Sequence, residues 1–329
     1  MDNNRKEGTG ERLINLSGKK IDLLSNSERN ESYKTLYDYC ENLNTGKPHI
    51  TLVQKIISKL LSASRKYSLE IRGEENLPRD GVLIMCNHSN THDAFTAAEA
   101  LYSTGLPSTF FATSEGLSPM LAALFKAARA SLMQRNNKES ANNAVLEMAS
   151  KLIHGDTCVI FGESVWNLHP LLPMLNLKTG GAKMAAISQK PIIPTIFEYV
   201  EVPSLCCKEQ EIYEKCIVTF GKPYFVDRNR SLITQTKEIQ NIMEQTRKEI
   251  WRENGIKKDA IEDIDVNFYI NHTGLKVFES LAAFDYEKEK SYVLSVDGQP
   301  VEYMYTLDDS GNFIPGELTR AVFEKTLNR

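Results

Sequence analysis

Apolar positions in the middle of the chain follow two alternating patterns. Short unbroken apolar runs occupy residues 81–86, 108–113, 131–135, 157–161, 191–197 and 216–220. Apolar side chains at helical spacing occupy residues 93–104, 117–129, 138–153 and 180–189. The unbroken runs predict buried strands and the spaced positions predict amphipathic helices. Strands that alternate with helices predict an α/β fold with a mostly parallel central sheet flanked by helices.

Two further amphipathic segments flank this region. Residues 231–254 predict a long final helix. Residues 50–66 carry Leu52, Ile56 and Leu60 at helical spacing, and all their charges are Lys or Arg. Such a helix lies on an anionic membrane surface or packs against its own domain, and packing is the more common outcome. Both alternatives stay open from the sequence.

The two ends of the chain differ from the middle in their pattern of apolar and polar residues. We expect residues 1–66 to form a helical N-terminal extension, residues 67–256 the main domain and residues 257–329 a small C-terminal extension. In the C-terminal extension, apolar and aromatic residues flank Asp297-Gly298 and Ser310-Gly311, which predicts β-hairpins.

Composition narrows the class of protein. Apolar residues make up 41% and charged residues 25%, which is ordinary for a globular chain. A net charge of -4 gives no general nucleic-acid footprint, so we expect no nucleic-acid partner. The N-terminus is polar, and no apolar run reaches the roughly 20 residues of a membrane span. With six cysteines and no CxxC pair, the sequence predicts buried reduced thiols in a cytoplasmic protein, soluble or peripheral on the inner face of a membrane.

The candidate chemistry lies in the motif NHSNTHD at residues 87–93. It follows a predicted strand, so His88 stands at the carboxyl end of that strand, where open α/β sheets build their sites. Asp93 starts the next helix, where it can cap the helix and accept an imidazole N–H. A histidine held by a carboxylate is a competent general base. Because no GxSxG nucleophile accompanies the pair, we expect direct attack by a deprotonated acceptor hydroxyl.

Two other interpretations of this motif remain. In the first, Asp93 is only a helix cap beside a turn histidine. Alternatively, His88 and His92 stand four residues apart with Asp93 as an oxygen ligand, which suggests a metal site. That spacing shares a face only within a helix, and no third His or Cys lies nearby, so we expect no metal.

The segment RGEENLPRDGVLIMCNHSNTHD, residues 72–93, resembles the glycerolipid acyltransferases related to lysophosphatidate acyltransferase. Their signature is H-x-x-x-x-D, and the resemblance continues through three further blocks over residues 67–250. It implies a glycerol-3-phosphate acyltransferase-like fold. It also implies a catalytic pair and one matched position in each later block: His88 and Asp93, then Arg135, Glu163 and Pro194.

The resemblance implies transfer of a fatty acyl group from acyl-CoA or acyl carrier protein to a hydroxyl of a lysophospholipid or glycerol-phosphate-like acceptor. The thioester is a co-substrate, and no other cofactor is expected. Arg135 would grip a phosphate or carboxylate with two parallel hydrogen bonds, and Glu163 would orient acceptor hydroxyls or that arginine. Lys178 and Lys183 flank a glycine pair at a predicted helix start and would add to the anion site. Pro194 is expected among the substrate-binding residues.

The third block departs from the family pattern. It reads Phe161-Gly162-Glu163-Ser164-Val165, where the family usually has F-P-E-G-T. This departure leaves the acceptor open and keeps two alternatives: an acyltransferase for a glycolipid or natural product, or a non-catalytic lipid-binding protein. The helices after Asp93 and Gly116 are rich in small and apolar residues, which predicts an acyl-chain groove with Ala123 or Ala127 in its wall.

Overall fold

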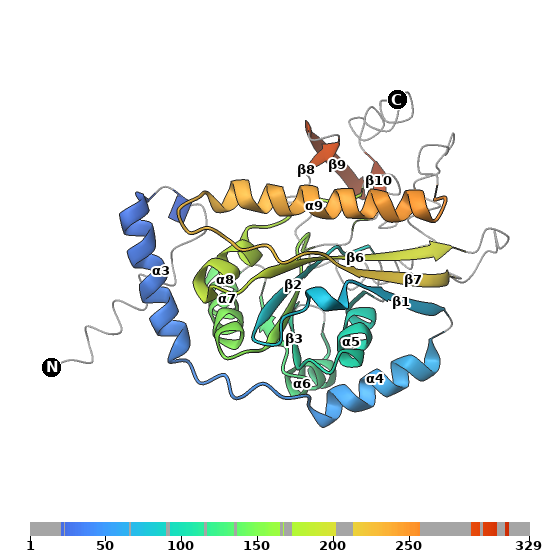
Figure 1. The fold of residues 1–329 in the computed structure, drawn as a ribbon, viewed down its shortest axis with the longest axis horizontal. Helices are drawn as coiled ribbons and strands as arrows, with labels where there is room; N and C mark the ends of the chain where they lie inside the picture. The colour runs from blue at the N-terminus through green and yellow to red at the C-terminus, as the bar shows by residue number, and fades with distance from the viewer. Residues whose placement is uncertain are drawn as a thin grey trace.

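The computed structural model describes most of the main domain and parts of both extensions. The described residues are 21–22, 24–65, 67–89, 93–114, 117–134, 137–164, 167, 173–201, 213–256, 291–296, 299–307 and 313–315. Figure 1 shows helices packed on both sides of one central sheet.

The central sheet has seven strands. In spatial order they are β1 (Ser68–Arg72), β7 (Tyr213–Phe220), β6 (Ile192–Glu201), β2 (Val82–Cys86), β5 (Thr157–Phe161), β3 (Ser108–Thr113) and β4 (Ser131–Met133). Every neighbouring pair is parallel except β6 and β7, which are antiparallel. The predicted mostly parallel α/β sheet is therefore confirmed. Strand β1 was not predicted, because its sequence SLEIR has only two apolar residues and lies at the sheet edge.

The helices of the main domain divide between the two faces of the sheet. Along β2, Leu83 and Met85 pack with the cluster that contains residues of α7, α8 and α9. Ile84 and Cys86 point to the opposite face and pack with α5. This alternation follows from the two-residue period of a strand, and it leaves all five residues of β2 buried. The bounds are α5 (Asp93–Ser103), α6 (Pro119–Ala127), α7 (Lys138–Ile153), α8 (Gly180–Ser188) and α9 (Leu232–Glu253), with a short η1 (Glu74–Asn76) after β1. Each α-helix lies within two residues of its predicted range at either end.

Two helices precede the sheet. Helix α3 (Asn26–Glu41) begins at a capping box formed by Ser25 and Glu28 and packs on α7 and α8. Helix α4 (Leu52–Ser64) begins at a second capping box and packs against α5. Within the described residues, no helix is long and apolar enough to cross a membrane.

The apolar stripe predicted for residues 50–66 is divided between the interior and the surface. Ile57 is half-buried in the gap between α4 and the domain, and Ser58 is only 4% exposed. Leu52, Ile56 and Leu60 remain 71%, 50% and 63% exposed. Packing against the domain is therefore real but covers only part of the apolar surface of α4.

The described part of the C-terminal extension forms a separate antiparallel sheet. Strand β9 (Gln299–Leu307) pairs with β8 (Ser291–Val296) on one side and with β10 (Phe313–Pro315) on the other. In sequence, β8 and β9 flank Asp297-Gly298, and β9 and β10 flank Ser310-Gly311, where the hairpin turns are predicted. The four cysteines in the described residues, Cys40, Cys86, Cys158 and Cys216, are buried thiols as predicted, and Cys206 and Cys207 lie outside those residues.

Candidate active site

Asn87 fixes the point where the chain leaves the sheet. Parallel pairing of β2 with β6 ends at Cys86 and Thr195. Beyond it, the fully buried Asn87 side chain accepts the Phe197 N–H at 2.7 Å and donates to the Phe197 carbonyl at 3.0 Å. An amide side chain supplies both a donor and an acceptor, so it continues the ladder for one more residue. His88 is consequently the first residue clear of the sheet edge.

His88 and Asp93 form a hydrogen-bonded pair. His88 Nδ1 lies 2.9 Å from Asp93 Oδ2, and the Ser89 N–H donates to the same oxygen at 2.7 Å. Because a carboxylate can only accept, Nδ1 carries the proton and Nε2 is the ring nitrogen directed away from Asp93. Asp93 is fully buried as the first residue of α5, where the helix dipole favours its negative charge.

The Phe161 ring stacks on one face of the His88 imidazole. It stacks on His88 with ring centroids 4.2 Å apart and an angle of 22° between the planes. Phe161 is the last residue of β5, the neighbour of β2. The ring of His88 is thus oriented by one hydrogen bond and one aromatic face, and its side chain keeps 17% of its surface exposed.

Glu163 holds the backbone of residues 87–89, which we call the catalytic turn after the role expected of His88. It is 1% exposed, its Oε1 accepts the His88 N–H at 2.8 Å, and its Oε2 accepts the Leu175 N–H at 2.7 Å. Burial raises the pKa of Glu163 to about 8, against the lowering effect of these two N–H donors and of Arg247. In this arrangement both carboxylate oxygens are bound to backbone groups. The predicted contact of Glu163 with an acceptor or with Arg135 remains a prediction.

The unusual third block has a local explanation in the structure. The Gly162 N–H donates to the Cys86 carbonyl at 3.0 Å, a bond that proline lacks the hydrogen to make. A Cβ at Gly162 would also lie 2.7 Å from Leu177 Cδ2. Ser164 adopts φ 65°, in the left-handed region that favours glycine, so the backbone keeps a glycine-like turn without the glycine.

The other predicted site residues that the structure describes are Pro194, Lys178 and Lys183, and their surroundings differ. Pro194 is buried in β6 opposite Met85, and its carbonyl accepts the Gly221 N–H at 2.8 Å. Lys178 is exposed. Lys183 is 5% exposed in α8 near Cys40 of α3, and burial lowers its pKa to about 8. The structure therefore brings His88, Asp93 and Glu163 together but turns Lys183 toward α3.

Two residues of the predicted site cannot be placed. Arg135 and His92 lie outside the described residues, so their contacts with the catalytic turn stay predictions. Within the residues that the structure does describe, no three His, Cys, Asp or Glu side chains are grouped as metal ligands.

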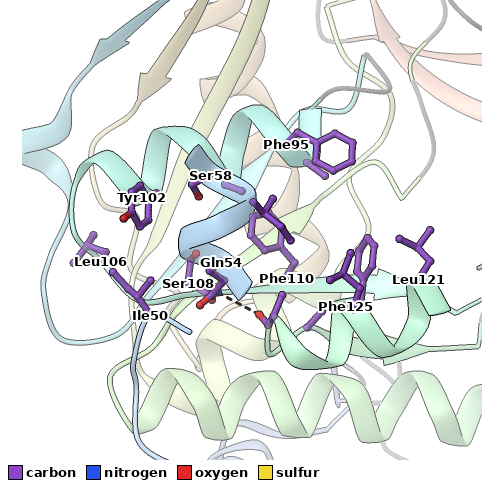
Figure 2. A pocket seen from close by; sticks show the side chains of 16 residues that line it. Ile50, Gln54, Ser58, Phe95, Tyr102, Leu106, Ser108, Phe110, Leu121 and Phe125 are labelled. Atoms are coloured by element: carbon purple, nitrogen blue, oxygen red, sulfur yellow. Dashed lines mark hydrogen bonds between the residues drawn. The ribbon is translucent and has the colours of Figure 1, made fainter. Parts of the chain in front are cut away.

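An apolar cavity of about 110 Å³ reaches the first turn of α5. Figure 2 shows it between α4, α5, α6 and β3, with Phe95, Phe110 and Phe125 directed toward it. Ala94 and Phe95, which follow Asp93 directly, belong to its wall. Gln54 closes one side, where its Nε2 donates to the Ser108 carbonyl at 2.5 Å.

The cavity lies between α5 and α6, where the acyl-chain groove is predicted, but its wall differs from the predicted one. The small residues that line it are Ala94, Ala98, Ala128 and Ala130, together with Ser58 and Ser108. Ala123 and Ala127 are exposed and do not line it, so their predicted place in the wall was wrong. The helical phase of α6 turns Leu121, Leu124 and Phe125 inward instead.

Comparison with known proteins identifies the main domain. Residues 68–198 match the family model described as Acyltransferase. We call residues 68–198 the acyltransferase segment, after the family whose model they match. The acyltransferase segment runs from the start of β1 into β6 and includes the catalytic turn, so the resemblance inferred from the motifs is confirmed.

The chain was also compared with solved structures and with curated protein sequences. The chain is similar to the crystal structure of the 1-acyl-sn-glycerophosphate (LPA) acyltransferase, PlsC, from Thermotoga maritima, with 16% sequence identity and a TM-score of 0.45. That alignment covers 68% of this chain and 82% of the other. No curated protein matches the sequence.

Proposed function

We propose that this acyltransferase moves a fatty acyl group from an acyl thioester to a hydroxyl of a lysophospholipid or glycerol-phosphate-like acceptor. The observation that carries the proposal is the His88–Asp93 hydrogen bond of 2.9 Å at the end of β2, within the acyltransferase segment. The donor would be acyl-CoA or acyl carrier protein, and it serves as co-substrate.

The proposed reaction uses His88 as a proton carrier. His88 Nε2 takes the proton from the acceptor hydroxyl as that oxygen attacks the thioester carbonyl carbon. Collapse of the tetrahedral intermediate breaks the carbon–sulfur bond, and the imidazolium returns its proton to the leaving thiolate. Asp93 keeps Nδ1 protonated and stabilises the imidazolium that exists between the two transfers.

The apolar cavity is the proposed site of the acyl chain. Its wall starts at Ala94 and Phe95, next to Asp93, so a chain bound there would hold its thioester carbonyl near His88. The polar side chains of the lining are Gln54 and Ser58 of α4, Tyr102 of α5 and Ser108 of β3, and the others are apolar. The Gln54 amide is already bonded to the Ser108 carbonyl, so it closes the cavity without offering an unsatisfied donor.

Substitutions at Ala98 are expected to shorten the preferred acyl chain. Ala98 lies in the cavity wall on α5, so Ala98→Leu and Ala98→Trp should remove chain-binding volume in that order. Competition between acyl donors of different lengths measures the shift. Ala123→Trp is the matched control, because Ala123 is exposed outside the cavity. Equal chain preference in all three variants would exclude the cavity as the chain site.

A membrane surface is the proposed source of the acceptor. Leu52, Ile56 and Leu60 project from α4, and the exposed Lys55 and Lys59 lie on the same outer side of the helix. Exposed apolar residues interleaved with lysines suit the interface of an anionic bilayer. On α6, across the cavity, Met120 is also 82% exposed. We therefore propose peripheral binding through α4 and α6, with the cavity facing the lipid.

Reversal of the two lysine charges is expected to weaken this binding. Each lysine near an anionic surface contributes about 1 kcal/mol. Lys55→Glu/Lys59→Glu should therefore lower the partition coefficient by more than about tenfold, because repulsion replaces attraction. Sedimentation with vesicles that contain phosphatidylglycerol measures the coefficient, and Lys34→Glu on the exposed surface of α3 is the control. Undiminished binding of the double variant would contradict the proposed surface.

The proposed activity is tested by product analysis. Purified protein is incubated with a long-chain acyl-CoA or acyl carrier protein and lysophosphatidate, glycerol phosphate or a glycolipid, and mass spectrometry identifies the acylated product. We expect diacylated phospholipid from lysophosphatidate. A glycolipid acceptor is the second candidate, because the third block departs from the family at Gly162 and Ser164. Consumption of thioester without any acylated product would instead show a hydrolase.

A further inference from the structure

Arg247 of α9 is a buried charge outside the matched acyltransferase segment. Its side chain is 9% exposed, and its Nε donates to Glu198 Oε2 of β6 at 2.5 Å. Its Nη1 donates to the Pro173 carbonyl at 2.7 Å, and the guanidinium lies 5.3 Å from the centre of the Trp251 ring. The planar fork of arginine thus joins β6, α9 and the segment that begins at Pro173.

Residues 173–178 connect α9 with the catalytic turn. On the α9 side, Arg247 binds the Pro173 carbonyl, and Gln240 Oε1 accepts the Leu177 N–H at 3.1 Å. On the other side, the Leu175 N–H donates to Glu163 at 2.7 Å, and the Lys178 N–H donates to the Gly162 carbonyl at 2.9 Å. We call residues 173–178 the bridging segment.

The catalytic turn is attached to the far end of the same series of contacts. The Glu163 carboxylate that binds Leu175 also accepts the His88 N–H at 2.8 Å. A shift of the bridging segment would move the Leu175 N–H, and Glu163 could not then satisfy both donors in the same position. Contacts therefore run without interruption from Arg247 through Pro173, Leu175 and Glu163 to His88.

Stability alone does not account for this ion pair. Helix α9 already packs on the sheet through Ile239, Met243 and Ile250, which belong to the main apolar core. Two buried charges lose hydration, and well-packed apolar residues in their place are often neutral or stabilising. A buried arginine that binds a loop carbonyl is more readily explained by the geometry it imposes on that loop.

We propose that Arg247 is a positioning residue for His88. The inference rests on the proposed function, because it takes His88 as the catalytic base. Arg247 does not contact the imidazole; it fixes the bridging segment, and this segment fixes Glu163 and the backbone of His88. A misplacement of the base by about 1 Å can lower a rate about 100-fold. Arg247 should consequently affect the chemical step more than substrate binding.

The test removes the ion pair without leaving a lone buried charge. In Glu198→Leu/Arg247→Met both charges are replaced by apolar side chains, so the fold should persist, and thermal unfolding checks this. We expect kcat for acyl transfer to fall between about 10-fold and 100-fold, with KM for donor and acceptor within about twofold of the wild type. Arg252→Met, at an exposed position of α9, should leave both constants unchanged.

A second arm separates positioning from a general structural effect. In the His88→Ala background the same double change should lower the residual single-turnover rate no further, because residues that act as a unit are not additive. An equal loss in both backgrounds, or a kcat within twofold of the wild type, would overturn the inference. Should the wild type transfer no acyl group, the proposed function fails instead. A wild type that loses activity only on His88→Ala would retain that function and reject the role of Arg247.

Discussion

Replacement of His88 by alanine is expected to abolish acyl transfer and leave the chain folded. The substitution removes the ring that carries the proton, and general-base catalysis of this kind contributes about 10²-fold to 10⁴-fold. The backbone N–H of residue 88 can still donate to Glu163, because that contact does not involve the side chain. The substitution removes the stacking on Phe161 and the hydrogen bond to Asp93, while Asp93 Oδ2 still accepts the Ser89 N–H.

Product formation measured by mass spectrometry, together with thermal unfolding, checks this expectation. His49→Ala is the matched control, because the His49 side chain is exposed and its Nδ1 lies 2.9 Å from the Lys47 carbonyl, away from the candidate site. An acyltransferase should lose its product only in the His88 variant. Unchanged turnover would contradict the proposed mechanism, and unchanged lipid binding without turnover in the wild type would support a lipid-binding protein.

The hydrogen-bonded pair of His88 and Asp93 was predictable because its geometry is local. His88 and Asp93 are five residues apart, and a strand that ends at Cys86 followed by a helix that begins at Asp93 leaves little freedom between them. The unbroken apolar run over 82–86 reveals the strand, and the spacing of Thr96, Ala97 and Ala100 reveals the buried face of the helix. Strand order and the antiparallel direction of β7 depend on contacts between distant segments and were not predicted.

The environment of the pair was less predictable, for the same reason. Glu163 was expected to face a substrate, yet both of its oxygens bind backbone groups that are 75 and 12 residues away in sequence. The periodicity of a sequence predicts which side of a helix is apolar, but it does not predict how much of that side the neighbouring elements cover. For this reason α4 leaves Leu52 and Leu60 exposed, and the wall of the cavity contains Ala98 rather than Ala123.

The third block shows how a departure in sequence can preserve a structure. Ser164 holds the left-handed conformation that glycine would adopt more easily, and Gly162 provides an N–H and a close approach that proline could not. Glu163 between them keeps its contact with His88. The two changed residues thus alter the surroundings of the catalytic turn without breaking its connection to β2.

Replacement of Asp93 by asparagine is the second large effect that we expect. Asp93 Oδ2 accepts both the His88 Nδ1–H and the Ser89 N–H, and an amide oxygen can accept the same two donors. The turn should therefore keep its shape, and the unfolding temperature should change little. The negative charge that stabilises the imidazolium is lost, however, and an amide can rotate to present its NH₂ group to Nδ1. The corresponding change in Ser-His-Asp enzymes costs about 10⁴-fold in kcat.

Steady-state kinetics of Asp93→Asn distinguish two roles of Asp93: stabilising His88 as the general base, or only capping helix α5. A support for the base predicts that kcat falls by about 10² or more while KM for donor and acceptor stays near the wild-type value. A helix cap predicts that both kcat and the unfolding temperature stay near their wild-type values, because Asn and Asp cap helices about equally well. Asp80→Asn is the control, because that carboxylate is exposed and paired with Lys190. Asp93 is fully buried, so its carboxylate does not contact solvent. It is hydrogen-bonded to His88, so its negative charge is placed to stabilise a protonated imidazole.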